Sequence, residues 1–301
     1  MIKKKTSASG AEALFVAAFT YALTGILVRE VNSMWSDSGQ VLARFLLVLV
    51  ILAGYSLLRK KKLTFPSNKL HLTLGLGAAF ALMVFFFTAA IGKTTVANVL
   101  FVFYAVNMIS AFVLGTIILK EKVNRNKVIA LGFAFIGLAV YSDAVIGGNL
   151  GIILSILAGI CGGATSLVSK QLTGIDRNAA LIGQYLVATA VAAFMILFSS
   201  GEIVRTVSLH DTVLTVVFAL VIILGSYLTL YGFQHFDVNI GTVIMSTELV
   251  FAAVMAYFLY DEVPKLHELI GGIFIFTGSV VASGVFDKSP RTGNTQIAQP
   301  D

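Results

Sequence analysis

The chain can be aligned with itself at an offset of 141 residues. The matched positions include Thr24 with Thr165, Thr88 with Thr229, Asn98 with Asn239, Glu121 with Glu262, and Gly137 with Gly278. A period of this length indicates two copies of one structural unit. Each copy contains five long apolar stretches, and because five is an odd number, the second copy must cross a membrane in the opposite sense to the first. The repeat therefore predicts two inverted halves, an architecture that recurs among secondary transporters.

The composition supports placing these halves in a lipid bilayer. Of 301 residues, 57% are hydrophobic and only 12% are charged, far from the values of a soluble domain. Membrane β-strands would show alternating short segments, whereas the apolar runs here are continuous and about 20 residues long, as helices require. We predict an all-α integral membrane protein with ten transmembrane helices, at residues 11–31, 38–58, 70–91, 95–119, 126–145, 149–172, 178–199, 211–233, 238–260 and 265–286.

Basic residues predict the orientation of these helices. With both termini in the cytoplasm, sixteen of the 21 lysines and arginines fall on the cytoplasmic side, which is the positive-inside bias. The net charge of +6 is thereby explained without a nucleic-acid partner. We predict a multi-pass membrane protein. The sixteen residues are Lys3, Lys4, Lys5, Arg59, Lys60, Lys61, Lys62, Lys69, Lys120, Lys122, Arg125, Lys127, Lys170, Arg177, Lys288 and Arg291.

The predicted organisation is a first five-helix repeat at residues 1–146, a second, inverted repeat at residues 147–286 and a disordered cytoplasmic tail at residues 287–301. None of the four prolines falls inside a predicted span, which argues against sharply broken helices. Cys161 is the single cysteine, and the four histidines are scattered. We therefore expect no internal disulfide, no metal site and no cofactor.

Several short motifs occur in the order and spacing of a known family. Arg44-Phe45 lies early in the second span, and acidic ends close the fourth and ninth spans at Glu121 and Glu262. Gly271 and Gly278 form a spaced pair in the tenth span. Together with the duplication, these motifs resemble the ten-span EamA-type exporters of the drug/metabolite transporter superfamily. The resemblance implies an exporter of small metabolites or amphiphilic compounds in the inner or plasma membrane, with a cavity between spans 1, 3, 4, 6, 8 and 9.

The chain departs from that family pattern at two positions. The proline usual after the acidic residue of the ninth span is Leu249 here, and the matching position of the fourth span is Met108. If those prolines act as hinges in relatives, this chain moves differently or is more rigid. The identity of the substrate does not follow from the resemblance, because function resides in the site and not in the fold.

Glu248 is the strongest candidate for a functional residue. It lies about ten residues into the ninth span, roughly 15 Å along a helix and hence near the middle of the bilayer. A carboxyl group there is costly and normally faces a cavity or a partner. Glu248 is predicted to bind substrate and to couple transport to protons; the alternative is a protonated or hydrogen-bonded packing group. The repeat pairs it with Asn107, which pseudo-symmetry is expected to bring toward it.

Other predicted substrate-binding residues are aromatic, hydroxyl-bearing or thioether side chains on the helices that the resemblance places at the cavity. For each one, a packing role is the alternative. They are Tyr21, Phe86, Tyr104, Thr165, Tyr227, Tyr231 and Met245. Two basic residues have a simpler interpretation: Arg44 is expected to reach the membrane interface, with a salt bridge to Glu248 as the alternative, and Lys170 is expected to anchor a helix end there.

The leading functional hypothesis is a secondary transporter that exports small amino-acid-like or amphiphilic metabolites by alternating access around an aromatic cavity. A passive facilitator or channel is the first alternative. An intramembrane enzyme is the second, but the spans contain no recognisable nucleophile or zinc motif. The expected partners are a small-molecule substrate and the lipid bilayer, and we expect a monomer or a weak dimer.

Overall fold

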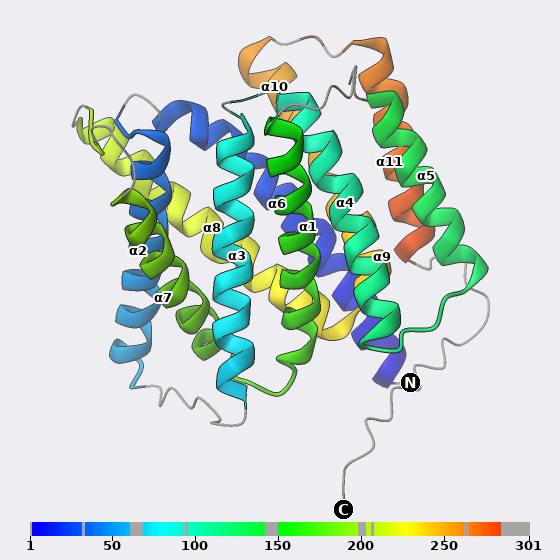
Figure 1. Cartoon of the computed structure of the whole chain (residues 1–301), viewed down its shortest axis with the longest axis horizontal. Helices are drawn as coiled ribbons and strands as arrows, with labels where there is room; N and C mark the ends of the chain where they lie inside the picture. The colour runs from blue at the N-terminus through cyan, green and yellow to red at the C-terminus, as the bar shows by residue number, and fades with distance from the viewer. Residues whose placement is uncertain are drawn as a thin grey trace, which may run out of the picture.

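The computed structural model describes residues 2–31, 34–60, 69–91, 93, 96–141, 150–197, 203–205, 208–261, 263 and 265–283. Within these ranges the secondary structure is helical, apart from one isolated β-bridge (Figure 1). The helices are α1 (Ile2–Val31), α2 (Asp37–Leu58), α3 (Leu70–Ile91), α4 (Val96–Ile117), α5 (Arg125–Tyr141), α6 (Leu150–Gln171), α7 (Arg177–Ile196), α8 (Leu209–His235), α9 (Val238–Met245), α10 (Glu248–Tyr260) and α11 (Leu266–Ser283).

Nine stretches of helix among the described residues are long and apolar enough to cross a membrane. They agree with the predicted spans to within a few residues, and α9 and α10 together form one of them, Val238–Tyr260. The remaining predicted span corresponds to α5, which has 17 residues and would measure about 26 Å, slightly less than the hydrocarbon core. Ten spans thus remain a prediction. The proposed boundary near residue 147 and the tail after residue 286 lie outside the described residues.

Contacts between loops show that the two repeats run in opposite directions. At one end of the molecule, the loop between α1 and α2 meets the loop between α7 and α8, where Trp35 pairs with Val204. At the other end, Lys69 of the α2–α3 connection donates to the carbonyl of Thr173 in the α6–α7 loop over 2.8 Å. Because α2 separates these two ends, the α1–α2 loop and its repeat counterpart, the α6–α7 loop, lie on opposite sides. We call the second end, which carries Lys120, Lys122 and Arg125, the basic end.

The repeats are interleaved, so neither forms a lobe of its own. α1 packs on α8, and the repeat-related pair, α6 and α3, packs in the same way; α2 pairs with α7, and α5 with α11 (Figure 1). One hydrophobic core is built mainly from α2, α3, α7 and α8. A second core is built mainly from α1, α4, α5, α9 and α11. Each core therefore draws helices from both halves of the sequence.

Glycines bring α5 and α11 into close contact at two related places. A Cβ atom on Gly137 would lie 2.7 Å from the carbonyl oxygen of Gly271 and from the backbone nitrogen of Ile275. A Cβ on Gly278 would lie 2.9 Å from the carbonyl oxygen of Ala130. These contacts exchange under the 141-residue offset, and they show close backbone approach at small residues, as is usual between helices in lipid.

The ninth predicted span is interrupted at Ser246 and Thr247, although it contains no proline. The backbone nitrogen of Thr247 donates to the carbonyl of Ile244, and that of Leu249 donates to Ser246, so the helix tightens to a three-residue repeat. The hydroxyls of Ser246 and Thr247 also donate to carbonyls three residues earlier, each over 2.7 Å. Such hydroxyl bonds bend helices. The expectation of an unbroken helix, which rested on the lack of proline, is therefore wrong for this span.

Candidate functional site

Glu248 begins α10 directly after the interruption, and its partner is a tyrosine of the other repeat. The hydroxyl of Tyr104, on α4, donates to Oε2 of Glu248 over 2.5 Å. Tyr104 is 4% exposed and packs in the second core beside Met108 and Met245. A short hydrogen bond between a phenol and a carboxyl group fixes the position of both side chains. Two of the predicted site residues are thus brought together.

Asn107 lies one turn beyond Tyr104 on α4 and packs against α6. A Cβ on Gly162 would come within 3.1 to 3.3 Å of three atoms of the Asn107 amide, so a larger residue there would require this amide to shift slightly. Asn107 is 8% exposed, and its Oδ1 atom has no hydrogen-bond partner within the described structure. The hydrogen bond of Glu248 is therefore made by Tyr104, and not by the predicted partner Asn107.

Tyr21, on α1, belongs to a group of three hydroxyls that reaches into the first core. Its hydroxyl lies 3.2 Å from Oγ of Ser226 on α8, and the same Oγ lies 2.6 Å from the hydroxyl of Tyr185 on α7. The ring of Tyr21 rests on Gly225, where a Cβ would approach it to 2.9 Å. Because Ser226 and Tyr185 are buried, these three hydroxyls satisfy one another away from water. Tyr185 and Ser226 were not predicted from the sequence, because an isolated hydroxyl-bearing residue belongs to no recognisable motif.

Aromatic rings line the same part of α1, α4 and α10. Phe251, one turn after Glu248, lies edge-on to Phe15 and Phe19 of α1, with ring centroids 5.1 and 5.4 Å apart. On the other side, Phe103 lies edge-on to Tyr104 at 5.0 Å. Edge-to-face packing of this kind is favourable between aromatic rings. Aromatic rings of both repeats therefore lie one residue from Tyr104 on α4 and one turn from Glu248 on α10.

Tyr227 and Tyr231 lie elsewhere, on the basic-end part of α8, where both contact Arg177. The Arg177 guanidinium lies 5.4 Å from the ring centroid of Tyr227 and 4.6 Å from that of Tyr231, and it donates to the Tyr227 hydroxyl over 3.1 Å. A cavity of about 380 Å³ is lined by Arg177 and Tyr227, together with Gln234 and His235. Tyr227 thus belongs to a polar pocket near the basic end, and Tyr231 contacts the arginine of that pocket.

The other predicted residues have contacts typical of packing. Thr165 donates to the carbonyl of Cys161 in its own helix, Phe86 contacts the neighbouring ring of Phe85, and Met245 is partly buried in the second core. The Arg44 side chain donates to the carbonyl of Gln40, and its guanidinium lies 4.8 Å from the Phe218 ring. The described contacts of Arg44 therefore do not include the salt bridge to Glu248 that was the alternative for it.

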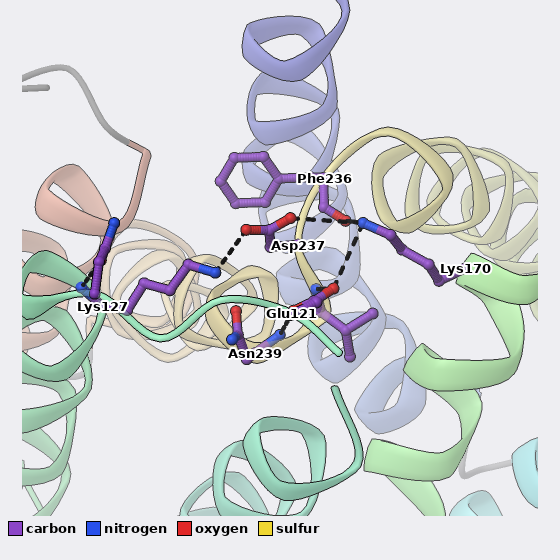
Figure 2. Close-up of polar contacts among 8 residues, drawn as sticks. Glu121, Lys127, Lys170, Phe236, Asp237 and Asn239 are labelled. Carbon is purple, nitrogen blue, oxygen red and sulfur yellow. Dashed lines mark hydrogen bonds and ion pairs between the residues drawn. The ribbon is translucent and has the colours of Figure 1, made fainter. Parts of the chain in front are cut away.

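Four charged residues form a second polar feature, at the basic end (Figure 2). The Lys127 ammonium lies 2.7 Å from Oδ2 of Asp237, and the Lys170 ammonium lies 3.5 Å from Oε1 of Glu121 and 3.7 Å from Oδ1 of Asp237. Lys170 also donates to the carbonyl of Phe236 over 2.6 Å. We call Glu121, Lys127, Lys170 and Asp237 the basic-end cluster. Lys170, predicted to be an interface anchor, makes ion pairs here instead.

The side chain of Glu121, from the α4–α5 loop, lies at the N-terminus of α9. Its carboxylate accepts hydrogen bonds from the backbone nitrogens of Val238, at 2.8 Å, and Asn239, at 3.1 Å (Figure 2). Burial, followed by repulsion from Asp237, raises the pKa of Glu121 above its usual range, while Lys170 and the two backbone donors oppose that rise. The repeat-related Glu262 lies outside the described residues. Sequence analysis singled out Glu121 as a motif residue but could not identify its partners.

The sequence model of the EamA-like transporter family matches residues 8–142 and 149–284, that is, both repeats. The chain belongs to the EamA-like transporter family. Among the solved structures that match this EamA-like chain is one described only as "Crystal structure of protein", with a TM-score of 0.76 and 15% sequence identity. It aligns over 92% of this chain and 96% of its own, which shows a shared fold. Among curated proteins, no sequence matches.

Membership in this family places the two polar features in a membrane transporter with two repeats. The family is one of transporters, in agreement with the functional class predicted from the sequence. No cluster of three or more potential metal-ligating side chains occurs among the described residues. In this EamA-like chain, Glu248 and Tyr104 are the candidates for a substrate site, and the basic-end cluster lies at one end of the molecule.

Proposed function

We propose that this protein is a secondary transporter of the cell membrane that exports small amino-acid-like or amphiphilic metabolites. The observation that carries this proposal is the hydrogen bond between Tyr104 and Glu248. It joins α4 to α10, two helices that occupy equivalent positions in the two inverted repeats. A carboxyl group held at the meeting point of inverted repeats is the usual location of a transporter's binding site.

The arrangement of the helices supports alternating access as the mechanism. Inverted repeats give a protein two related conformations, each open at one end, around a fixed central site. The two hydrophobic cores would move as bodies relative to each other. Substrate would enter at the basic end, which we place in the cytoplasm on account of its lysines and arginines.

The chemistry of the central residues favours a substrate with an apolar part and a polar, preferably cationic, group. Phe15, Phe19 and Phe251 offer ring faces and edges, and Glu248 offers a carboxyl group. An ammonium group can pair with such a carboxylate and lie against aromatic rings. Substrate and proton would compete for Glu248, which would couple export to proton entry.

A tolerance screen with toxic metabolite analogues, in cells with and without the protein, would identify substrates. Purified protein in liposomes would then be tested for counterflow of each hit. We expect substrate on the far side to accelerate uptake. We also expect the proton-driven flux of the Glu248→Gln variant to be at least about tenfold lower than that of the parent, since a loss of 1.4 kcal/mol in interaction free energy corresponds to a factor of ten. Flux that never saturates would indicate a channel, and unchanged proton coupling in Glu248→Gln would refute the role of Glu248.

A further inference from the structure

The basic-end cluster joins the end of α6 to the segments that precede α5 and α9. Lys170 ends α6, which packs on α3 and α4, whereas Glu121 and Asp237 precede α5 and α9 in the second core. Lys127 and Asp237, by contrast, connect α5 with the start of α9. The Lys170 ammonium is therefore the member of the cluster that ties α6 to the start of α9 (Figure 2).

We propose that Lys170 is the closing residue of the basic end, and that release of its ammonium from Glu121, Asp237 and the Phe236 carbonyl is a step in opening that end to substrate. The proposal rests on the alternating-access function proposed above. It assigns a role in closure to a lysine that the sequence predicted to be an anchor at the membrane interface.

Burial differs among the members of the cluster. The side chains of Glu121 and Lys127 are 6% and 8% exposed, whereas those of Lys170 and Asp237 are 23% and 42% exposed. Directly beside them, Asn239 is completely buried, and neither its amide oxygen nor its amide nitrogen has a hydrogen-bond partner within the described structure. Removing one partner from a buried ion pair strongly disfavours the conformation that contains it.

The cluster is also connected mechanically to the central site. Glu121 caps the first turn of α9, and α9 has only eight residues before the interruption at Ser246 and Thr247. Glu248 follows immediately. A movement of α9 at the basic end would therefore reach the interruption, and with it the Glu248 carboxyl group, within two turns of helix.

Thiol labelling can measure closure without any substrate. Cys161, the single native cysteine, is replaced by alanine, and Asn239→Cys introduces a reporter at the fully buried position beside the cluster. The protein is placed in lipid nanodiscs, so that a membrane-impermeant methanethiosulfonate reaches both ends. The rate of modification then reports how often the basic end opens.

In this background, Lys170→Gln is expected to raise the labelling rate by about tenfold or more, because it biases a two-state equilibrium toward the open form. Lys122→Gln removes the same charge from an exposed position in the α4–α5 loop and is expected to leave the rate unchanged.

Equal labelling rates in Lys170→Gln and Lys122→Gln would overturn the proposal. If Lys170→Gln proves too unstable to purify, Asp237→Asn removes one of the two carboxylates that face the ammonium, and a rate equal to that of Lys122→Gln would be just as decisive. The result is independent of the transport assay. A faster rate without flux would contradict the proposed function, and flux with unchanged labelling would contradict the role of Lys170.

Discussion

Glu248 shows how the two repeats have become chemically different. The repeat places Asn107 opposite it and places Met245 opposite Tyr104, so the hydrogen-bonded pair has no equivalent in the exchanged positions. Sequence analysis identified both Tyr104 and Glu248 as candidates. It could not identify their contact, because Tyr104 and Asn107 are three residues apart on the same helix face, and only packing decides which one meets Glu248.

Replacing Tyr104 with phenylalanine would remove the hydrogen bond and keep the ring. We expect Tyr104→Phe to retain the fold, because the ring still fills its place, and to lower the maximal flux in liposomes by about tenfold, the effect of losing about 1.4 kcal/mol from a hydrogen bond to a charged group.

Tyr257→Phe is the matched control, since Tyr257 lies on α10 and is 45% exposed. Flux in this variant should equal that of the parent. A parental rate in Tyr104→Phe as well would show that the hydroxyl group has no part in transport.

Among the helices, the boundaries were predictable and their contacts were not. The length of the apolar stretches and the polar residues between them predicted the spans, because each span must cross the same thickness of hydrocarbon. The interruption of the ninth span at Ser246 and Thr247 was missed, since it depends on hydroxyl bonds to the backbone and not on proline. Glycine content indicated close packing, but the partner of each glycine depends on the three-dimensional arrangement.

The contact between α5 and α11 gives a test at this scale. Gly137→Ala would force a methyl group against the backbone of α11, where less than 3 Å is available, and we expect it to destabilise the protein by about 1 to 3 kcal/mol. The melting temperature in detergent should fall by several degrees.

Gly132→Ala, on the same helix, provides the comparison. A Cβ there meets nothing within 4 Å, so this variant should melt at or slightly above the temperature of the parent, given the better helix propensity of alanine. If both variants melt alike, the close approach of α5 and α11 is not present in solution.

For the whole molecule, the 141-residue repeat predicted two inverted halves, and the loop contacts place equivalent connections at opposite ends. The interleaving of the halves was not predictable, because a repeat reports similarity between segments and says nothing of which segments pack together. The orientation in the membrane depends on charge alone and remains a prediction.

Reporter fusions would establish that orientation. A green fluorescent protein fused after residue 175 should fluoresce, because the α6–α7 loop lies at the basic end that we place in the cytoplasm. Alkaline phosphatase fused after residue 204, in the α7–α8 loop, should be active on the other side. Activity of the phosphatase at the first position would reverse the predicted topology.

The interleaved cores have a consequence for biosynthesis. A chain is made from its N-terminus, so α2 and α3 enter the bilayer before α7 and α8, their partners in the first core, exist. In the same interval, Tyr104 and Asn107 lack the helices that later cover them. The first five helices are therefore only loosely associated in the bilayer, with polar groups uncovered, until the second repeat has been inserted. Maturation of this transporter is consequently a late event, completed only when the last helix has joined α5.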